Sequence, residues 1–439
     1  MTTQTSVLQF EAPWPVYCVD WCKTPAPGQL QRPRSAFRLG ISSFTEDFTN
    51  RIAIVGLQDE SVLVEDDYDY SSSAYPDFVT LCEVHHGYPA TCLQWQPASA
   101  GSYNWLTRTA ATELLATTGD ALRLWEYNSD APPQMTQYIG RQPVHGHAMT
   151  TRAVLHGQSK VSPGQSQPKG APLTNFSWNE KSPQLLVTSS IDTTCTVWNI
   201  DTQTAITQLI AHDREVYDVA WLPNSTDIFV SVGADGSLRA FDLRSLEHST
   251  ILYETPAPKS APPPPSTSPN PTARPPSSPL LRIAFPCGDQ NYMSTFHMDG
   301  SRVQILDIRN PGHPVLQLSA HHSQVNSVGW GSSQGHSLLA TAADDCQLLL
   351  WDLNKFMQGG AETDHRGTGS RLSSPMPSNQ KKKAIEVTDP VMAYTAQNPI
   401  TYLAWSPQIP GVTMSTGHQT TPGEWIAISS GTSVRTLKV

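Results

Sequence analysis

The chain repeats one hydrophobic pattern seven times: an aromatic residue preceded by apolar residues two and five positions earlier. The closing aromatics are Trp21, Trp95, Trp178, Trp221, Phe285, Trp330 and Trp405. Alternate side chains of a β-strand point to the same face, so each aromatic shares a face with the apolar residue two places before it. The pattern therefore predicts seven strands, each with one buried face.

A second pattern follows in five segments, where an apolar run leads through a serine or threonine to an aspartate. Leu185–Asp192 and Leu338–Asp345 are two examples. Aspartate at this place is typical of a tight turn, because its carboxylate accepts hydrogen bonds from the local backbone. Another apolar run follows each turn and ends, for example, at Trp198 or Trp351. Each repeat is thus predicted to be a set of antiparallel strands joined by turns.

The spacing of the repeats indicates one structural unit that carries insertions. Trp178 lies 43 residues before Trp221, and four-stranded propeller blades take about 40–45 residues. The longer intervals must hold additional chain, and four polar segments provide it: 129–170, 254–279, 357–389 and 406–423. Segments of this composition bury too little apolar area to offset the entropy of ordering the chain, so we predict disordered loops between strands.

Residues 1–439 are therefore predicted to form a single domain, an all-β, seven-bladed β-propeller. A lone sheet has two exposed edges, whereas a closed ring shields the edges and buries the faces of the blades. The last repeat ends with the apolar stretches 426–428 and 434–437. We expect the N-terminal stretch 7–10 to supply the outer strand of this last blade and thereby to close the ring.

Composition and charge narrow the class of protein. The net charge of -10 argues against a general nucleic-acid-binding protein, which needs a basic surface. The N-terminus lacks the basic and apolar regions of a signal peptide, and no apolar run approaches the length of a membrane span. The seven cysteines, an odd number, favour free thiols in the core over a disulfide framework. We expect an intracellular protein that contacts no membrane and no nucleic acid directly.

Several motifs carry a resemblance to a known family. They are Glu11–Tyr17, Ser189–Trp198, Leu209–Tyr217, Ser231–Ser237, Phe241–Thr250, Asp389–Ala396 and Glu424–Ile428. In these motifs the chain resembles the WD-repeat family of plant anthocyanin and trichome regulators, the transparent-testa-glabra type. The animal members of that family are cullin-four-ligase-associated factors (number seven) that also scaffold kinases. The resemblance runs through the whole propeller and fails in the insertions.

By this resemblance, we expect a non-catalytic scaffold for protein–protein interactions, present in the nucleus and the cytoplasm. The implied partners are dual-specificity kinases, homeodomain-interacting kinases, and transcription factors of the Myb and basic helix-loop-helix classes. The implied process is regulation of transcription. The sequence contains no glycine-rich phosphate-binding motif and no paired-histidine metal motif, so we expect neither a cofactor nor a metal.

Three groups of polar residues recur in the repeats, and the first two resemble a catalytic triad. They are His212, Ser231 and Asp235; His321, Thr341 and Asp345, completed by Trp351; and Thr188 and Asp192 with Trp198. A hydrolase needs one triad with strict geometry, so a set that recurs in several repeats is poor support for a nucleophile. The family pattern interprets each group as a hydrogen-bonded tetrad of the blade, in which buried polar groups satisfy one another.

Two further motifs suggest a contact with a ubiquitin ligase. Asp242-Leu-Arg244 and Asp307-Ile-Arg309 match, in relaxed form, the end of the box that receptors of cullin-four ligases use to bind the ligase adaptor. The planar arginine fork suits such an interface because it binds acceptors bidentately. The alternative is a solvated arginine near a strand end. A substrate receptor of a cullin-four ligase is therefore an alternative function, which can coexist with a scaffold on another surface.

An enzyme built on the propeller is the remaining alternative. It would need one polar constellation in the central channel or on one face, different from what the blades share. The sequence alone reveals none, and we therefore expect no catalysis.

Overall fold

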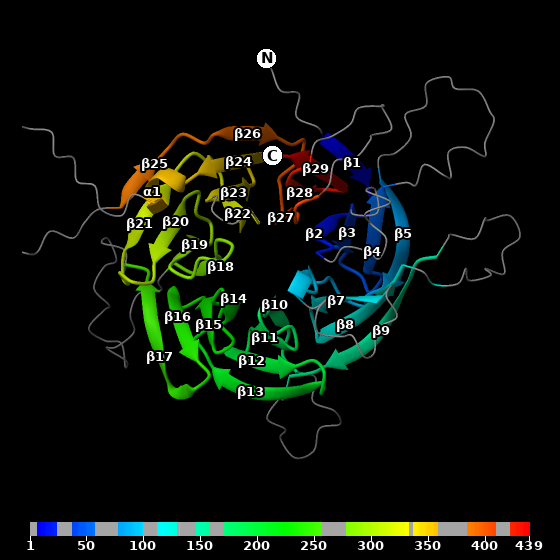
Figure 1. The fold of residues 1–439 in the computed structure, drawn as a ribbon, viewed down its shortest axis with the longest axis horizontal. Helices are drawn as coiled ribbons and strands as arrows, with labels where there is room; N and C mark the ends of the chain where they lie inside the picture. The colour runs from blue at the N-terminus through cyan, green and yellow to red at the C-terminus, as the bar shows by residue number, and fades with distance from the viewer. Residues whose placement is uncertain are drawn as a thin grey trace, which may run out of the picture.

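The structure, a computed structural model, describes residues 7–23, 37–57, 78–99, 112–129, 131, 146–157, 170–256, 278–332, 337–358, 384–409 and 422–439. Within these residues seven sheets stand around a central axis, like the blades of a propeller, and all their strand pairs are antiparallel except β21 with β25 (Figure 1). The predicted seven-bladed, all-β architecture is confirmed. The only helix in the described part is α1 (Asn354–Gln358), and no helix there is long and apolar enough to cross a membrane.

Each blade contains four strands in order from the channel outward, and one blade has a fifth. Blade 1 consists of β2 (Val16–Trp21), β3 (Arg38–Ser43), β4 (Arg51–Leu57) and β5 (Phe78–His85). Blade 2 consists of β6 (Cys92–Trp95), β7 (Thr112–Thr118), β8 (Leu122–Asn128) and β9 (Ala148–Leu155). Blade 3 consists of β10 (Leu173–Trp178), β11 (Leu185–Ser190), β12 (Thr194–Asn199) and β13 (Thr204–Ile210).

The second half of the ring repeats this arrangement. Blade 4 consists of β14 (Val216–Trp221), β15 (Ile228–Gly233), β16 (Ser237–Asp242) and β17 (Ser245–Glu254). Blade 5 consists of β18 (Leu280–Ala284), β19 (Tyr292–His297), β20 (Val303–Asp307), β21 (Pro314–Leu318) and β25 (Ile385–Val387). Blade 6 consists of β22 (Val325–Trp330), β23 (Leu338–Ala343), β24 (Gln347–Asp352) and β26 (Met392–Thr395). Blade 7 consists of β27 (Tyr402–Trp405), β28 (Trp425–Ser430), β29 (Ser433–Lys438) and β1 (Val7–Glu11).

The repeated aromatics lie at or just beyond the ends of the inner strands and join neighbouring blades. All of them are buried except Phe285, which is half-buried. The indole N–H of Trp221 donates to the carbonyl of Ser177 at 3.1 Å, so blade 4 is bonded to blade 3. Trp21 donates to Ala404 at 3.1 Å in the same way, across the closure of the ring. The pattern that predicts a buried face therefore also supplies contacts from blade to blade.

The N-terminal strand closes the ring, as predicted. β1 pairs antiparallel with β29, from Val7 opposite Leu437 to Glu11 opposite Ser433. Leu8 and Phe10 are buried, while the residues that alternate with them are exposed. The last blade thus takes its outer strand from the start of the chain, and the backbone edge of β29 is paired.

The predicted insertions are correct only in part. The segment 129–170 contains β9, and 357–389 contains the end of α1 and the strand β25. The segment 254–279 begins with the last residue of β17, and in 406–423 Ile409 pairs with Gly423. An outer strand has one open face, so β9 buries few side chains and lacks the pattern of an inner strand. Most of the remaining residues of the four insertions lie outside the described residues.

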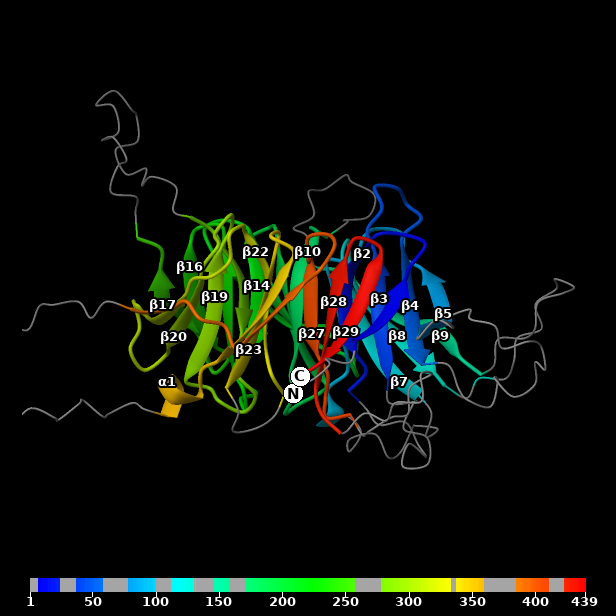
Figure 2. The same cartoon turned by 90° about the horizontal axis from the view of Figure 1, so that it is seen from above.

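The disc has two faces, which the strand registers define. The inner strands begin at the upper face and end at the lower face, in the orientation of Figure 2. Val16 at the start of β2 pairs with Ser43 at the end of β3, so the β3–β4 loop lies on the upper face. Ile228 at the start of β15 pairs with Asp242 at the end of β16, so Asp242 lies on the lower face.

Candidate functional site

The polar group in blade 6 is a closed hydrogen-bond network. Thr341 Oγ1 lies 3.0 Å from the indole nitrogen of Trp351 and 2.8 Å from His321 Nε2. His321 Nδ1 lies 3.0 Å from an oxygen of Asp345. With a neutral imidazole, the indole N–H donates to the hydroxyl, the hydroxyl to Nε2, and Nδ1–H to the carboxylate. The Thr341 hydroxyl is fully buried and occupied on both sides, so it is not a nucleophile.

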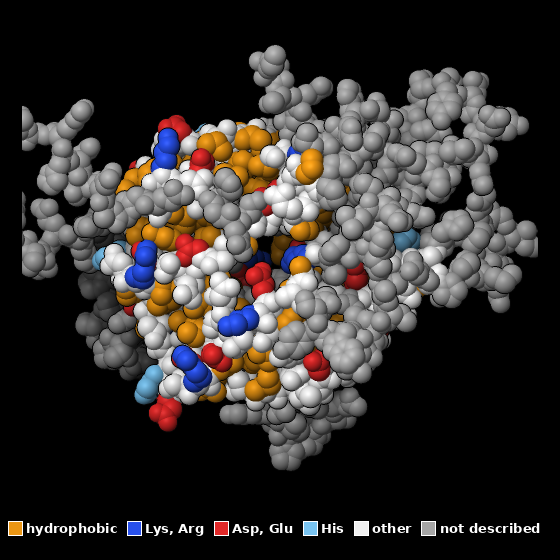
Figure 3. All heavy atoms as spheres, in the orientation of Figure 1, with side chains coloured by type: hydrophobic (Ala, Val, Ile, Leu, Met, Phe, Trp, Pro, Cys, Tyr) orange, Lys and Arg blue, Asp and Glu red, His pale blue; other side chains and the backbone are white. Residues whose placement is uncertain are grey.

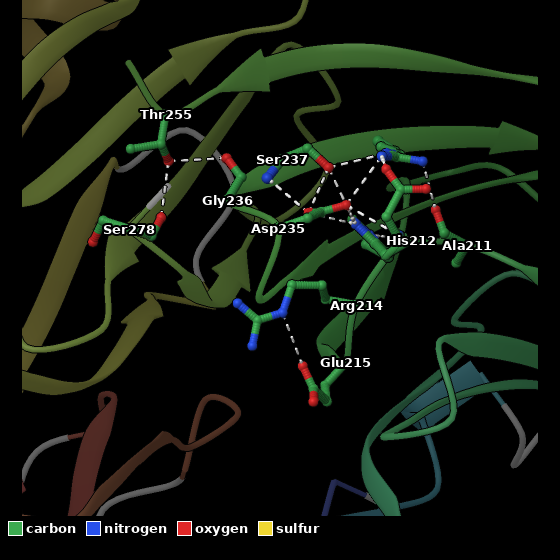
Figure 4. Close-up of polar contacts among 12 residues, drawn as sticks. Ala211, His212, Arg214, Glu215, Asp235, Gly236, Ser237, Thr255 and Ser278 are labelled. Carbon is green, nitrogen blue, oxygen red and sulfur yellow. Dashed lines mark hydrogen bonds and ion pairs between the residues drawn. The ribbon is translucent and has the colours of Figure 1, made fainter. Parts of the chain in front are cut away.

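Blade 4 holds the same network with one substitution. His212 Nε2 lies 2.7 Å from Ser231 Oγ. His212 Nδ1 lies 3.0 Å from Asp235, and Figure 4 shows this contact. Phe241 stands where blade 6 has a tryptophan and cannot donate a hydrogen bond. Its ring instead stacks on Phe229 with 5.2 Å between the centroids. The predicted group is therefore assembled, and its fourth member contributes packing rather than a hydrogen bond.

The predicted group in blade 3 is incomplete. The indole N–H of Trp198 donates to Thr188 Oγ1 at 2.9 Å, as expected. Asp192, however, is exposed and accepts hydrogen bonds from the backbone and side chain of Thr194 within its own turn. Within the described residues no histidine contacts Thr188. The expectation of a tetrad here is corrected, because the segment before β10 supplies no histidine at the position of His321.

Sequence reasoning missed a partial network in blade 2. Thr117 Oγ1 accepts the indole N–H of Trp125 at 2.9 Å and lies 3.2 Å from His86 Nε2. Asp120 is occupied by Arg123, whose nearest guanidinium nitrogen lies 2.6 Å away. The turn of this blade is one residue shorter than in the other repeats, which obscured its similarity to the networks of blades 4 and 6. The histidine after β5, His86, was the residue that could have indicated the network.

Because His321 and His86 are buried, we expect acid to destabilise the folded protein. Burial lowers the pKa of His321, although Asp345 opposes the shift, and burial also lowers the pKa of His86. The unfolded chain then binds protons that the folded chain does not, so stability is complete above the unfolded histidine pKa of 6.5 and falls below it. We expect a slope of at most about 1.4 kcal/mol per pH unit for each histidine.

Urea unfolding at pH 7.5 and 5.5 measures this effect. His321→Gln should reduce the loss of stability between the two pH values. His322→Gln, at the exposed neighbouring position, should leave the loss as in the wild-type protein. An equal loss in the His321→Gln variant would contradict the assignment.

The two arginine motifs are exposed ion pairs at equivalent positions of blades 4 and 5. Arg244 contacts both carboxylate oxygens of Asp242 at 2.9 and 2.6 Å, and Arg309 contacts those of Asp307 at 2.9 and 2.8 Å. The arginine side chains are 66% and 57% exposed. The bonds from Arg244 lower the pKa of Asp242 to about 2. Each guanidinium is therefore held in place with further N–H donors facing solvent.

The second pair has an additional support. Arg309 Nη2 donates to the hydroxyl of Tyr292 at 3.0 Å, and its guanidinium carbon lies 5.2 Å from the centre of that ring. We call Asp242–Arg244 and Asp307–Arg309 the two Asp–Arg pairs. Both lie on the lower face, where β16 and β20 end.

The central channel contains a polar constellation that the sequence did not reveal. Tyr402 Oη lies 3.8 Å from Cys92 Sγ, and the rings of Tyr402 and Tyr17 lie 6.4 Å apart. Arg282 Nη1 donates to the carbonyl of Leu281 at 3.1 Å. Two cavities of about 300 and 690 Å³ are lined in part by Tyr402. A hollow edged by charged side chains is visible at the centre of the disc in Figure 3.

The buried channel residues Asp218 and Cys92 are held inside the ring. Asp218 accepts the backbone N–H of Ile283 in the next blade at 2.7 Å, and burial raises its pKa to about 6. Burial raises the pKa of Cys92 to about 12, so its thiol is not ionised at neutral pH. Among the described residues no group of three or more histidine, cysteine, aspartate or glutamate side chains is placed to hold a metal ion.

Comparison with known proteins agrees with this geometry. The WD domain, G-beta repeat model matches residues 203–242 and 312–352. A DDB1- and CUL4-associated factor 7 homolog of Dictyostelium discoideum is 36% identical over 99% of this chain and 98% of its own length. The chain belongs to the WD-repeat family. WD repeat-containing proteins of Schizosaccharomyces pombe and Saccharomyces cerevisiae are 34% and 30% identical, over 87% and 77% of their own lengths.

The WD-repeat match coincides with the most complete networks. Residues 203–242 include His212, Ser231 and Asp235, and 312–352 include the four residues of the blade 6 network. Both networks that contain a histidine and an aspartate therefore lie within the two matched repeats. Of the resemblance stated above, these relatives support the ligase-associated factors and lend no support to the plant anthocyanin-regulator type.

Proposed function

We propose that this WD-repeat protein is a non-catalytic interaction scaffold that docks the adaptor of a cullin-four ubiquitin ligase through the two Asp–Arg pairs. The observation that carries the proposal is their repetition: the same pair occupies the same position of two adjacent blades. Each arginine is oriented by its aspartate, so little side-chain freedom is lost when a partner binds.

The Dictyostelium relative supports this choice of partner. Its name associates that protein with DDB1 and CUL4, and the similarity extends over essentially the whole chain. A substrate receptor and a scaffold differ only in what the remaining surface binds. The adaptor contact therefore tests the ligase association, and the remaining partners test the scaffold.

Purified DDB1 and the full chain provide that test. The double variant Arg244→Ala, Arg309→Ala should bind DDB1 at least about tenfold more weakly, which is about 1.4 kcal/mol. The reason is the loss of charge-assisted hydrogen bonds from exposed guanidinium groups. Biolayer interferometry measures the affinity, and circular dichroism confirms that the variant is folded.

Arg51→Ala is a matched control, because Arg51 is also half-exposed and also paired, with Glu83. It should bind DDB1 with wild-type affinity. Equal binding by the double variant and the wild-type protein would remove the adaptor contact from the proposal.

The remaining partners are proposed from the family resemblance. They are dual-specificity and homeodomain-interacting kinases and transcription factors of the Myb and basic helix-loop-helix classes, in the nucleus and the cytoplasm. Affinity purification with mass spectrometry from both compartments tests them. A kinase should be recovered with the intact ring and lost with a chain that lacks β1.

A further inference from the structure

Two pairs of aromatic side chains lie at the upper face of blade 1, Tyr17 with Phe44 and Phe48 with Tyr88. Phe44 and Phe48 lie in the β3–β4 loop, Tyr88 follows β5, and Tyr17 lies near the start of β2. Phe44, Phe48 and Tyr88 are 50%, 68% and 39% exposed. The ring centroids are 5.7 Å apart for Tyr17 and Phe44, and 5.4 Å apart for Phe48 and Tyr88. We call these four residues the upper-face aromatic patch.

The loop that carries the patch is held by a buried side chain. Asn50 is 1% exposed, and its amide nitrogen donates to the carbonyls of Thr45 and Asp47 at 3.1 and 2.8 Å. Its amide oxygen accepts the hydroxyl of Ser43 at 3.0 Å and the backbone N–H of Thr45 at 2.9 Å. Figure 2 shows this loop standing above the upper edge of the disc, in blue.

The backbone at both phenylalanines is also held by hydrogen bonds, so their exposure is a fixed feature of the loop. The backbone N–H of Phe44 donates to the carbonyl of Pro15 at 2.9 Å, and the carbonyl of Phe48 lies 2.8 Å from His85 Nε2. Both rings therefore extend from a fixed backbone into solvent. Rigid, exposed aromatics are the anchors of protein interfaces, because they bury a large area at little cost in conformational entropy.

The charge around the patch is negative. Glu46 and Asp47 lie between the two phenylalanines in the chain and are exposed. The Glu46 carboxylate makes no hydrogen bond or ion pair with the described residues. Hydrogen bonds from Thr49 and Thr45 lower the pKa of Asp47, so this carboxylate is ionised at physiological pH. The nearby Arg51 is neutralised by Glu83.

We propose that the upper-face aromatic patch binds a basic segment of a partner protein, with a cationic side chain stacked on the exposed phenylalanines and paired with Glu46 and Asp47. An arginine or lysine gains both a cation–π contact and a carboxylate partner here. An apolar residue of the same segment covers the remaining aromatic surface. The two Asp–Arg pairs lie on the opposite face, so this binding is independent of the adaptor contact.

Alternative occupants fit less well. A second copy of this chain would bring together two acidic loops around a twofold axis, and like charges would oppose that contact. An anionic membrane surface would be repelled for the same reason. A basic segment is the partner whose charge complements both carboxylates.

A random dodecapeptide library displayed on phage provides the probe, selected against the full chain. Enriched sequences should contain arginine or lysine together with aromatic or aliphatic residues. Fluorescence anisotropy of one enriched synthetic peptide then measures affinity. Phe44→Ser, Phe48→Ser should weaken binding at least about tenfold, whereas the binding of DDB1 stays unchanged.

Single variants separate charge from apolar contact. Glu46→Lys leaves the hydrogen bonds of the loop intact and should weaken peptide binding several-fold. Arg51→Ala releases Glu83 and should tighten it. Ile210→Ser, which changes an apolar residue that is 76% exposed on β13 of another blade, should have no effect.

Each other outcome overturns the proposal. Acidic enriched peptides, equal binding to the double phenylalanine variant, or the absence of any enrichment would exclude a basic-segment site. A dimer in analytical ultracentrifugation that Phe48→Ser converts to a monomer would assign the patch to a second copy of this chain instead.

Discussion

Phe10→Ala should destabilise the propeller by about 3 kcal/mol in urea unfolding monitored by circular dichroism. The side chain of Phe10 is 9% exposed and packs in a cluster with residues of β28 and β29. Truncating a buried phenylalanine typically costs about 3–5 kcal/mol, and the open outer face of β1 places this position at the lower end. The strand closes the ring, so the loss extends beyond one blade.

The same strand offers a control. Val7 is 40% exposed on the opposite face of β1, and Val7→Ala should change the free energy of unfolding by less than about 1 kcal/mol. Both variants leave the backbone pairing with β29 unchanged. Equal effects of the two substitutions would mean that β1 does not close the ring through its buried face.

The sequence predicted those features that repeat locally. The inner strands, the turns after them and the groups in blades 4 and 6 depend on short sequence intervals that recur, and all of these were identified. The closing strand was also predicted, because a ring with one incomplete blade requires a strand from the other end of the chain. Outer strands such as β9 and β25 were missed, since one open face leaves too few buried positions to produce a pattern.

Features that depend on the closed ring could not be predicted. Cys92 and Tyr402 meet in the channel although 310 positions separate them in the chain. Nothing in either local sequence indicates the other. The upper-face aromatic patch is similar, because an exposed phenylalanine is indistinguishable in the sequence from a buried one. Ring geometry therefore places the binding surfaces, while the repeats supply the scaffold that holds them.

Removing the threonine hydroxyl at the centre of a blade network should lower the free energy of unfolding by an amount that depends on how many groups bond to it. Thr341→Val removes a fully buried hydroxyl and leaves both Trp351 Nε1 and His321 Nε2 without a partner. Each unsatisfied buried group costs about 1–3 kcal/mol, so we expect a loss of about 3 kcal/mol. Urea unfolding at pH 7.5 measures it.

Thr188→Val is the matched control, because it makes the same change at an equally buried threonine of blade 3. There the indole of Trp198 loses its partner and the carbonyl of Thr196 loses a long hydrogen bond of 3.4 Å, but no imidazole is affected, since no histidine among the described residues contacts Thr188. The expected loss is therefore about half, roughly 1.5 kcal/mol. Because valine replaces threonine with nearly the same shape in both blades, packing changes cancel in the comparison. Equal losses would mean that the imidazole of His321 contributes nothing to the network, and that the repeated histidine requires another explanation.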